Sequence, residues 1–261
     1  MENFFKQLNL TENDINLINA TIAPEFAPTF QIISNYKSKS IEFSNIYSDT
    51  RDIRNMFFIK MLNTLYSYNL DRCLINGLVD TNLNTQNWLK NLGLSEIINN
   101  WNTFKISHNF YNSFVFYIRL FSCLESTLRE IYFYLYPNEK QKKKFFKFHE
   151  IYTPMINDNS LKQEYTNLLK LLASIRNLIH NMGVSNIDDS ITYNGITYNF
   201  EAGKVPAKEV VNMINLLDLY NNDVLDFISD LFNCQNVRNI SNMPDNLSPD
   251  FKDFEDWISN N

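Results

Sequence analysis

The chain has 261 residues, of which 44% are hydrophobic and 15% aromatic, so it can bury a sizeable core and disorder of the whole chain is disfavoured. With only 5 glycines and 7 prolines, it lacks the punctuation that the many tight turns of an all-β fold require, which favours long helices. The net charge of -6 argues against broad, non-specific binding to nucleic acid, although it leaves room for a local basic site.

The spacing of the cysteines, and the lack of a signal peptide or a membrane-spanning segment, indicate a cytoplasmic protein. Cys73, Cys123 and Cys234 are far apart, odd in number and without metal-ligand spacing, so we expect reduced thiols. The N-terminus has no apolar core of the kind that a signal peptide needs. The most apolar stretch, residues 110–124, is interrupted by Arg119 and is too short and polar to span a bilayer. We therefore expect no membrane partner.

The first part of the chain, residues 1–105, predicts a helical region of unknown role. A helix is expected to begin near Thr11, and a second, capped by Thr50, to run to about Tyr68. Shorter helices are expected near 84–92 and 95–104, whereas residues 22–48, with two prolines, do not indicate a single element. No motif with recognisable chemistry occurs in this part.

Two long amphipathic helices follow. Apolar residues at steps of three and four predict a helix from His108 that Pro137 stops, with the buried stripe Phe110, Phe114, Tyr117, Phe121, Leu124, Leu128 and Ile131. After a lysine-rich segment, Ser160 and Gln163 have the spacing of a capping box. They predict a second helix that ends before Gly183 and buries Leu161, Tyr165, Leu168, Leu172, Ile175 and Ile179.

A hairpin and a last helix complete the predicted fold. Two alternating runs flank Asn194-Gly195, which predicts a two-residue turn that pairs Tyr193 with Ile196 and residue 191 with residue 198. Pro206 suits the first turn of a last long helix, which includes Val210, Met213, Ile214, Leu217, Val224, Phe227, Ile228 and Leu231. Residues 234–261 are rich in Asn, Asp and Pro, so we expect a loosely held tail. The fold class is therefore all-α, with one small β-hairpin.

One polar strip stands out on the second helix. Four residues turn a helix by about 400°, so Arg176 and His180 share a face, with Asn177 beside them and Asn181 one turn beyond Asn177. Arginine binds phosphate through paired hydrogen bonds, and histidine transfers protons near neutral pH. These side chains suffice for metal-free RNA cleavage by the ribose 2′-hydroxyl. The alternative is that Arg176 and His180 lie together by chance, near a helix C-terminus where the helix dipole favours cations.

The segment RNLIHNMG, residues 176–183, resembles the signature of the HEPN superfamily, an arginine, often followed by asparagine, and then a histidine. CLESTLREI, with Glu125 and Arg129, resembles the family's second conserved stretch, and ITYNGITYNFEAGKVP is similar to the hairpin that follows the motif in abortive-infection HEPN proteins. The resemblance covers residues 106–233. Only residues 177–179 separate Arg176 from His180, which is fewer than is usual in the family.

The resemblance implies a HEPN-like helical bundle that forms a homodimer and cleaves RNA without a metal, in a defence or toxin effector with a protein antitoxin or a defence partner. Arg176, Asn177 and His180 would be catalytic, supported by Glu125, Arg129 and Asn181. Met182 replaces the tyrosine found in the toxins that are paired with nucleotidyltransferases, so control by nucleotidylation is not expected.

A lysine-rich segment is the second candidate for RNA contact. Lys142, Lys143, Lys144 and Lys147 cluster beside phenylalanines, a pattern that can follow a phosphate backbone or, alternatively, form a solvated helix face. Glu125 and Arg129 likewise have the spacing of a simple intrahelical ion pair.

His108 and His149 have no partners at zinc-ligand spacing, and no nucleotide-binding loop or hydrolase elbow occurs, so we expect no metal and no cofactor.

Three hypotheses remain from the sequence. The first is a metal-independent endoribonuclease. The second is a non-catalytic HEPN module that binds RNA or a protein partner, and the third is a helical scaffold that uses the Arg–His face only for dimer packing.

Overall fold

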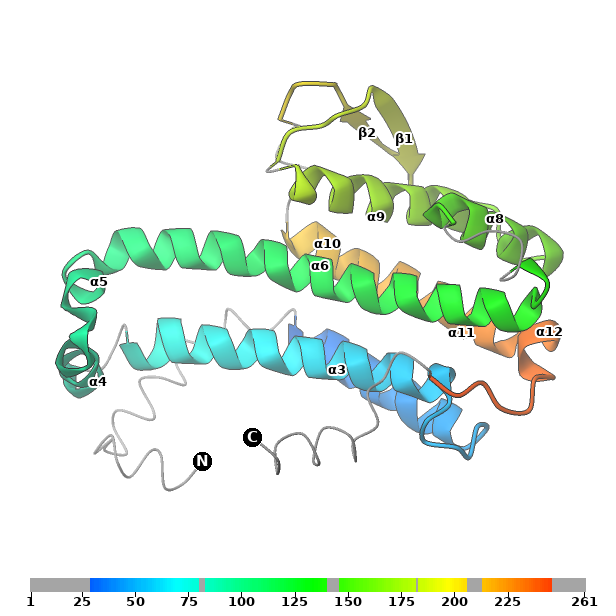
Figure 1. Ribbon diagram of the computed structural model, residues 1–261, viewed down its shortest axis with the longest axis horizontal. Coiled ribbons are helices and arrows are strands. Elements are labelled where there is room, and N and C mark those ends of the chain that lie inside the picture. The colour runs from blue at the N-terminus through cyan, green and yellow to red at the C-terminus, as the bar shows by residue number, and fades with distance from the viewer. Residues whose placement is uncertain (1–28, 80–82, 140–145, 182, 206–212, 246–261) are drawn as a thin grey trace.

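The architecture is helical apart from one hairpin in residues 29–79, 83–139, 146–181, 183–205 and 213–245, the parts of the chain that the computed structural model describes (Figure 1). This confirms the all-α expectation. The helix expected near Thr11, the start expected at Pro206 and the lysines at 142–144 lie outside the described residues.

A long helix, α6 (Trp101–Leu135), lies at the centre, with α3 (Ile53–Arg72) along one side and α8 (Phe148–Asp158) and α9 (Glu164–His180) on the other (Figure 1). It ends just before Pro137, as predicted. Its expected stripe is buried from Tyr117 to Ile131, whereas Phe110 is 56% exposed.

The N-terminal helices differ in two respects from the sequence prediction. Residues 29–44 form one helix, which buries Ile32, Ile33, Tyr36 and Phe43 although the sequence did not indicate a single element there. The cap of α3 is Asp52 rather than Thr50, because the Asp52 carboxylate accepts a hydrogen bond from the Arg54 backbone N–H.

Short helices join α3 to α6 at one end of the molecule. They are η1 (Cys73–Val79), α4 (Leu83–Leu89), η2 (Lys90–Leu94) and α5 (Ser95–Asn99). Gly93, with φ 87°, produces the kink within η2. The boundary expected between residues 105 and 106 falls inside α6.

The helix that carries the polar strip begins later than predicted. Ser160 has φ 54°, outside the helical region, and α9 starts at Glu164 without a side-chain hydrogen bond from its N-cap Gln163. The predicted capping box is therefore wrong. Gly183 is placed as expected: it has φ 88°, and its N–H donates to the Leu178 carbonyl, 2.9 Å away, at the end of α9.

The predicted hairpin and its register are confirmed. The strands β1 (Asp189–Tyr193) and β2 (Ile196–Phe200) pair antiparallel, with Tyr193 opposite Ile196 and Ile191 opposite Tyr198. Asn194 and Gly195 have φ values of 50° and 75°, as a two-residue turn of type I′ requires. The hairpin lies over α9 (Figure 1), where Lys170 Nζ is 2.8 Å from Asp189 Oδ1.

The C-terminal helical run consists of α10 (Met213–Leu219), η4 (Tyr220–Val224), α11 (Leu225–Asn233) and the short α12 (Gln235–Arg238). As predicted, Leu217, Val224, Phe227, Ile228 and Leu231 are buried.

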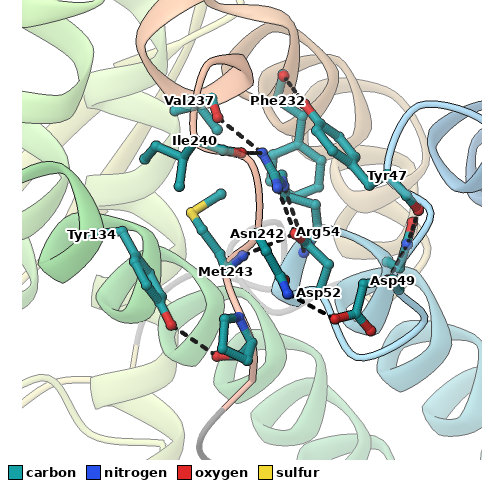
Figure 2. Close-up of polar contacts among 12 residues, drawn as sticks. Tyr47, Asp49, Asp52, Arg54, Tyr134, Phe232, Val237, Ile240, Asn242 and Met243 are labelled. Carbon is teal, nitrogen blue, oxygen red and sulfur yellow. Dashed lines mark hydrogen bonds and ion pairs between the residues drawn. The ribbon is translucent and has the colours of Figure 1, made fainter.

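The segment after α11 is held against α3 by buried polar contacts (Figure 2). The Arg54 guanidinium donates to the carbonyl oxygens of Val237 and Ile240, at 2.9 and 3.0 Å, and to the Asp52 carboxylate. Asp52 in turn accepts from the Met243 backbone N–H, at 3.0 Å. We expected a loosely held tail from residue 234, but its described part, residues 234–245, packs here and buries Val237 and Met243 completely.

Buried side chains from Ile32 to Met243 form one hydrophobic cluster, which includes residues from all three expected parts of the chain. None of the helices in the described ranges combines the length and apolar character that crossing a membrane requires.

Candidate functional site

Glu125 on α6 brings two arginines together. Its Oε1 lies 2.6 Å from Arg129 Nη2, which is the i, i+4 pair expected from the spacing. Its Oε2 lies 3.3 Å from Arg176 Nη2 on α9. Arg129 also donates to the Phe146 carbonyl, at 3.0 Å. One carboxylate therefore fixes a guanidinium from each of two helices.

The Arg176 side chain is 28% exposed, and its guanidinium carbon lies 5.1 Å from the centroid of the Phe121 ring. The ring and Glu125 together orient the guanidinium, while the exposed part remains accessible to a ligand. Arg176 is therefore positioned by the fold but is not enclosed by it.

Arg176 and Asn177 line a surface cavity of about 550 Å³ between α6, α8 and α9. His180 and Asn181 are exposed at the end of α9, and neither lines this cavity. The structure thus brings Arg176, Asn177, Glu125 and Arg129 together and leaves His180 one turn away, about 6 Å along the helix axis. The negative end of the α9 dipole lies here, and it favours positively charged side chains whether or not a ligand binds.

The cavity carries an excess of positive charge in a chain of net charge -6. Arg129, Lys147, Lys170 and Arg176 line it, against the carboxylates Glu125 and Asp189. Both carboxylates are already paired, Glu125 with the two arginines and Asp189 with Lys170. Such an arrangement favours an anionic ligand.

The first turn of α8 also faces the cavity. Lys147, which precedes the helix, and Phe148 and His149 all contribute to the lining. The positive end of a helix dipole favours anions, so the placement of this turn reinforces the excess of cations. Of the lysine-rich segment, Lys147 is the candidate residue that the structure describes, and it is exposed.

Tyr152, one turn further along α8, adds a neutral polar group to the lining. It is 4% exposed, and burial raises the pKa of its phenol, so the hydroxyl keeps its proton over the physiological range.

Sequence reasoning missed His149, Tyr152 and Lys170 as parts of this site. The available signal was the position of His149 at the end of the lysine-rich segment. What could not be read from the spacing is that α8 and α9 share a cavity, because that depends on how both helices pack on α6.

Comparisons with protein families, curated proteins and solved structures give no significant match to this chain. In the described parts of the chain, no cluster of three or more His, Cys, Asp or Glu side chains is arranged to hold a metal ion.

Proposed function

We propose that this protein is a metal-independent endoribonuclease of HEPN type, a cytoplasmic defence or toxin effector that acts on single-stranded RNA. The observation that carries the proposal is the position of Arg176. Glu125 and Phe121 fix its guanidinium in the wall of a cation-rich cavity. Asn177 and His180 are exposed along the same helix, so neither is enclosed by apolar side chains of its own subunit.

In the proposed reaction Arg176 binds the scissile phosphate and offsets its charge. The ribose 2′-hydroxyl loses its proton to a base, and its oxygen bonds to phosphorus. The bond from phosphorus to the 5′-oxygen breaks, and that oxygen takes up a proton. His180 performs one of these proton transfers, and Asn177 orients the phosphate or the imidazole. The products are a 2′,3′-cyclic phosphate and a 5′-hydroxyl.

A homodimer is part of the proposal. Exposed apolar side chains occur on α6, where Phe110 and Tyr111 are 56% and 57% exposed and Val115 is 46% exposed. Val184 and Ile187, beyond the end of α9, are also partly exposed. A second copy that covers such side chains would gain hydrophobic free energy. We propose that the two-fold axis of this dimer also brings the second polar strip close to the first.

The test is cleavage of single-stranded RNA in the presence of EDTA. Wild-type protein should cut the RNA, whereas Arg176→Ala and His180→Ala should each lose most of the activity and keep their helical circular dichroism. The control is Lys39→Ala on the helix formed by residues 29–44, where Lys39 pairs with Glu42 and contributes nothing to the cavity. Cleavage that requires magnesium, or that survives both substitutions, contradicts the proposal.

A module that binds RNA without cutting it is the second candidate. It is favoured by the position of His180 outside the cavity and by the ion pair that already engages Arg176. This candidate predicts that wild-type protein binds RNA, that Arg176→Ala weakens the binding, and that no product forms.

A further inference from the structure

His149 occupies the same cavity as Arg176 but comes from a different helix. It lies in the first turn of α8, whereas Arg176 and Asn177 lie on α9. His149 is exposed, and its side chain forms no hydrogen bond with another described residue. Its imidazole is therefore available to a ligand in the cavity.

Aromatic packing fixes the place of His149 relative to Arg176. The neighbouring Phe148 is buried, and its ring centroid lies 5.3 Å from that of Phe121. The guanidinium carbon of Arg176 lies 5.1 Å from the centroid of the same Phe121 ring. One ring on α6 thus contacts both Arg176 and the residue next to His149, and this ties the first turn of α8 to the phosphate-binding arginine.

The chemistry of RNA cleavage provides a role for such a group. One proton must leave the 2′-hydroxyl and another must reach the 5′-oxygen, and efficient catalysis uses a separate side chain for each transfer. The motif on α9 contains one histidine. A second imidazole that approaches from α8 would reach the phosphate from a different direction.

We propose that His149 performs one of the two proton transfers at the phosphate bound by Arg176, with His180 performing the other. This inference rests on the proposed RNA cleavage. It means that one subunit contains both proton-transferring groups, so the partner in a dimer need not supply the second.

Charged side chains on every neighbouring element face the same cavity, and they also influence its response to pH. They are Glu125 and Arg129 of α6, Lys147 before α8, Lys170 and Arg176 of α9, and Asp189 of β1. Tyr152 of α8 adds a titratable phenol, whose pKa is raised by burial. Substitution of His149 leaves all of them in place, so a change in the pH profile of the variant reports on His149.

The experiment measures single-turnover cleavage of a short RNA in EDTA as a function of pH, with saturating protein. Wild-type protein should give a bell-shaped profile, and His149→Gln should lower the rate by about 100-fold or more and lose one limb of the bell. His180→Gln should lose the other limb.

Binding of an uncleavable 2′-O-methyl RNA by His149→Gln should stay within about twofold of wild type, because the missing group transfers a proton and does not hold the phosphate. His108→Gln is the matched control, since His108 pairs with Asp71 and does not line the cavity.

A second substrate assigns the direction of transfer. RNA with sulfur in place of the 5′-oxygen has a leaving group that needs little protonation, so it restores cleavage to a variant that lacks the acid. Rescue of His149→Gln identifies His149 as the acid, and rescue of His180→Gln alone identifies His149 as the base.

Three results overturn the inference. If His149→Gln keeps both limbs and cleaves within about threefold of wild type, while Arg176→Ala is inactive, His149 transfers no proton and the proposed function stands. If His149→Gln loses binding and cleavage to the same extent, its role is to hold RNA. If wild-type protein cleaves no RNA, the proposed function fails and the inference fails with it.

Discussion

Arg54 and Asp52 form a charged pair whose side chains are 0% and 1% exposed (Figure 2). Two charges are removed from water here, so each depends on the other and on the backbone groups around it. Arg54 also stacks on Tyr47, with its guanidinium carbon 3.5 Å from the ring centroid. The pair joins α3 to the segment after α11.

We predict that Arg54→Met lowers the free energy of unfolding by about 3–5 kcal/mol, because it leaves the Asp52 carboxylate buried and unpaired. Methionine keeps much of the side-chain volume, so loss of packing contributes less. Adding Asp52→Asn to Arg54→Met should recover part of the loss, since it removes the unpaired charge. Urea denaturation measures both effects.

Lys39→Met is the control for this experiment, because Lys39 and Glu42 form an exposed pair. Such pairs contribute about 1 kcal/mol or less. If Arg54→Met and Lys39→Met had equally small effects, the contacts between α3 and the C-terminal segment would not hold the two together.

For individual residues, the sequence indicates contacts between positions that are close along the chain but not between positions that are far apart along it. The spacing of Glu125 and Arg129 predicted their ion pair, since four residues on a helix bring side chains together. The contact of Glu125 with Arg176 joins residues 51 positions apart and depends on how α9 packs on α6. The proximity of Phe148 and Arg176 to one Phe121 ring has the same origin, which is why His149 was not recognised from the sequence.

Among the elements, the hairpin was fully predictable because its turn has specific chemistry. Asn194-Gly195 suits two successive residues with positive φ, and the alternating runs on each side set the register. The start of α9 was not predictable in this way. The capping-box spacing of Ser160 and Gln163 occurs, but the chain turns through a positive φ at Ser160 before the helix begins.

We predict that Gly195→Ala destabilises the hairpin by about 1–2 kcal/mol, because a side chain at φ 75° is strained. A Cβ there would meet no atom within 4 Å, so the strain arises from the backbone alone. Gly195→Asn is the matched control, since asparagine tolerates this conformation better. Amide hydrogen exchange across β1 and β2 measures the change. Equal exchange rates in the two variants would contradict the turn geometry.

For the whole molecule, the sequence indicated an all-α fold but did not indicate how the parts of the chain pack against one another. Residues 1–105, 106–233 and 234–261 were distinguished by pattern and composition, whereas buried side chains from each of them join one cluster. The reason is that α3 packs along α6 and the segment after α11 returns to α3. No local sequence pattern predicts contacts of this kind.

The predicted assembly of the whole molecule is a two-fold homodimer. Light scattering at micromolar concentration should give about twice the monomer mass of 30.9 kDa. Phe110→Ser together with Tyr111→Ser should shift the protein towards the monomer, because these exposed side chains on α6 would lose apolar contact area. A wild-type protein that remains monomeric at this concentration and still cleaves RNA would refute the dimeric part of the proposal.

In the proposed reaction, Arg176 and its neighbours cut RNA through the ribose 2′-hydroxyl without a metal. The most direct measurement is mass spectrometry of the fragments that the protein releases from single-stranded RNA in EDTA. We expect fragments that end in a 2′,3′-cyclic phosphate, paired with fragments that begin with a 5′-hydroxyl, and we expect neither to form with Arg176→Ala. Fragments with 3′-hydroxyl and 5′-phosphate ends, or intact RNA after treatment with wild-type protein, would contradict it.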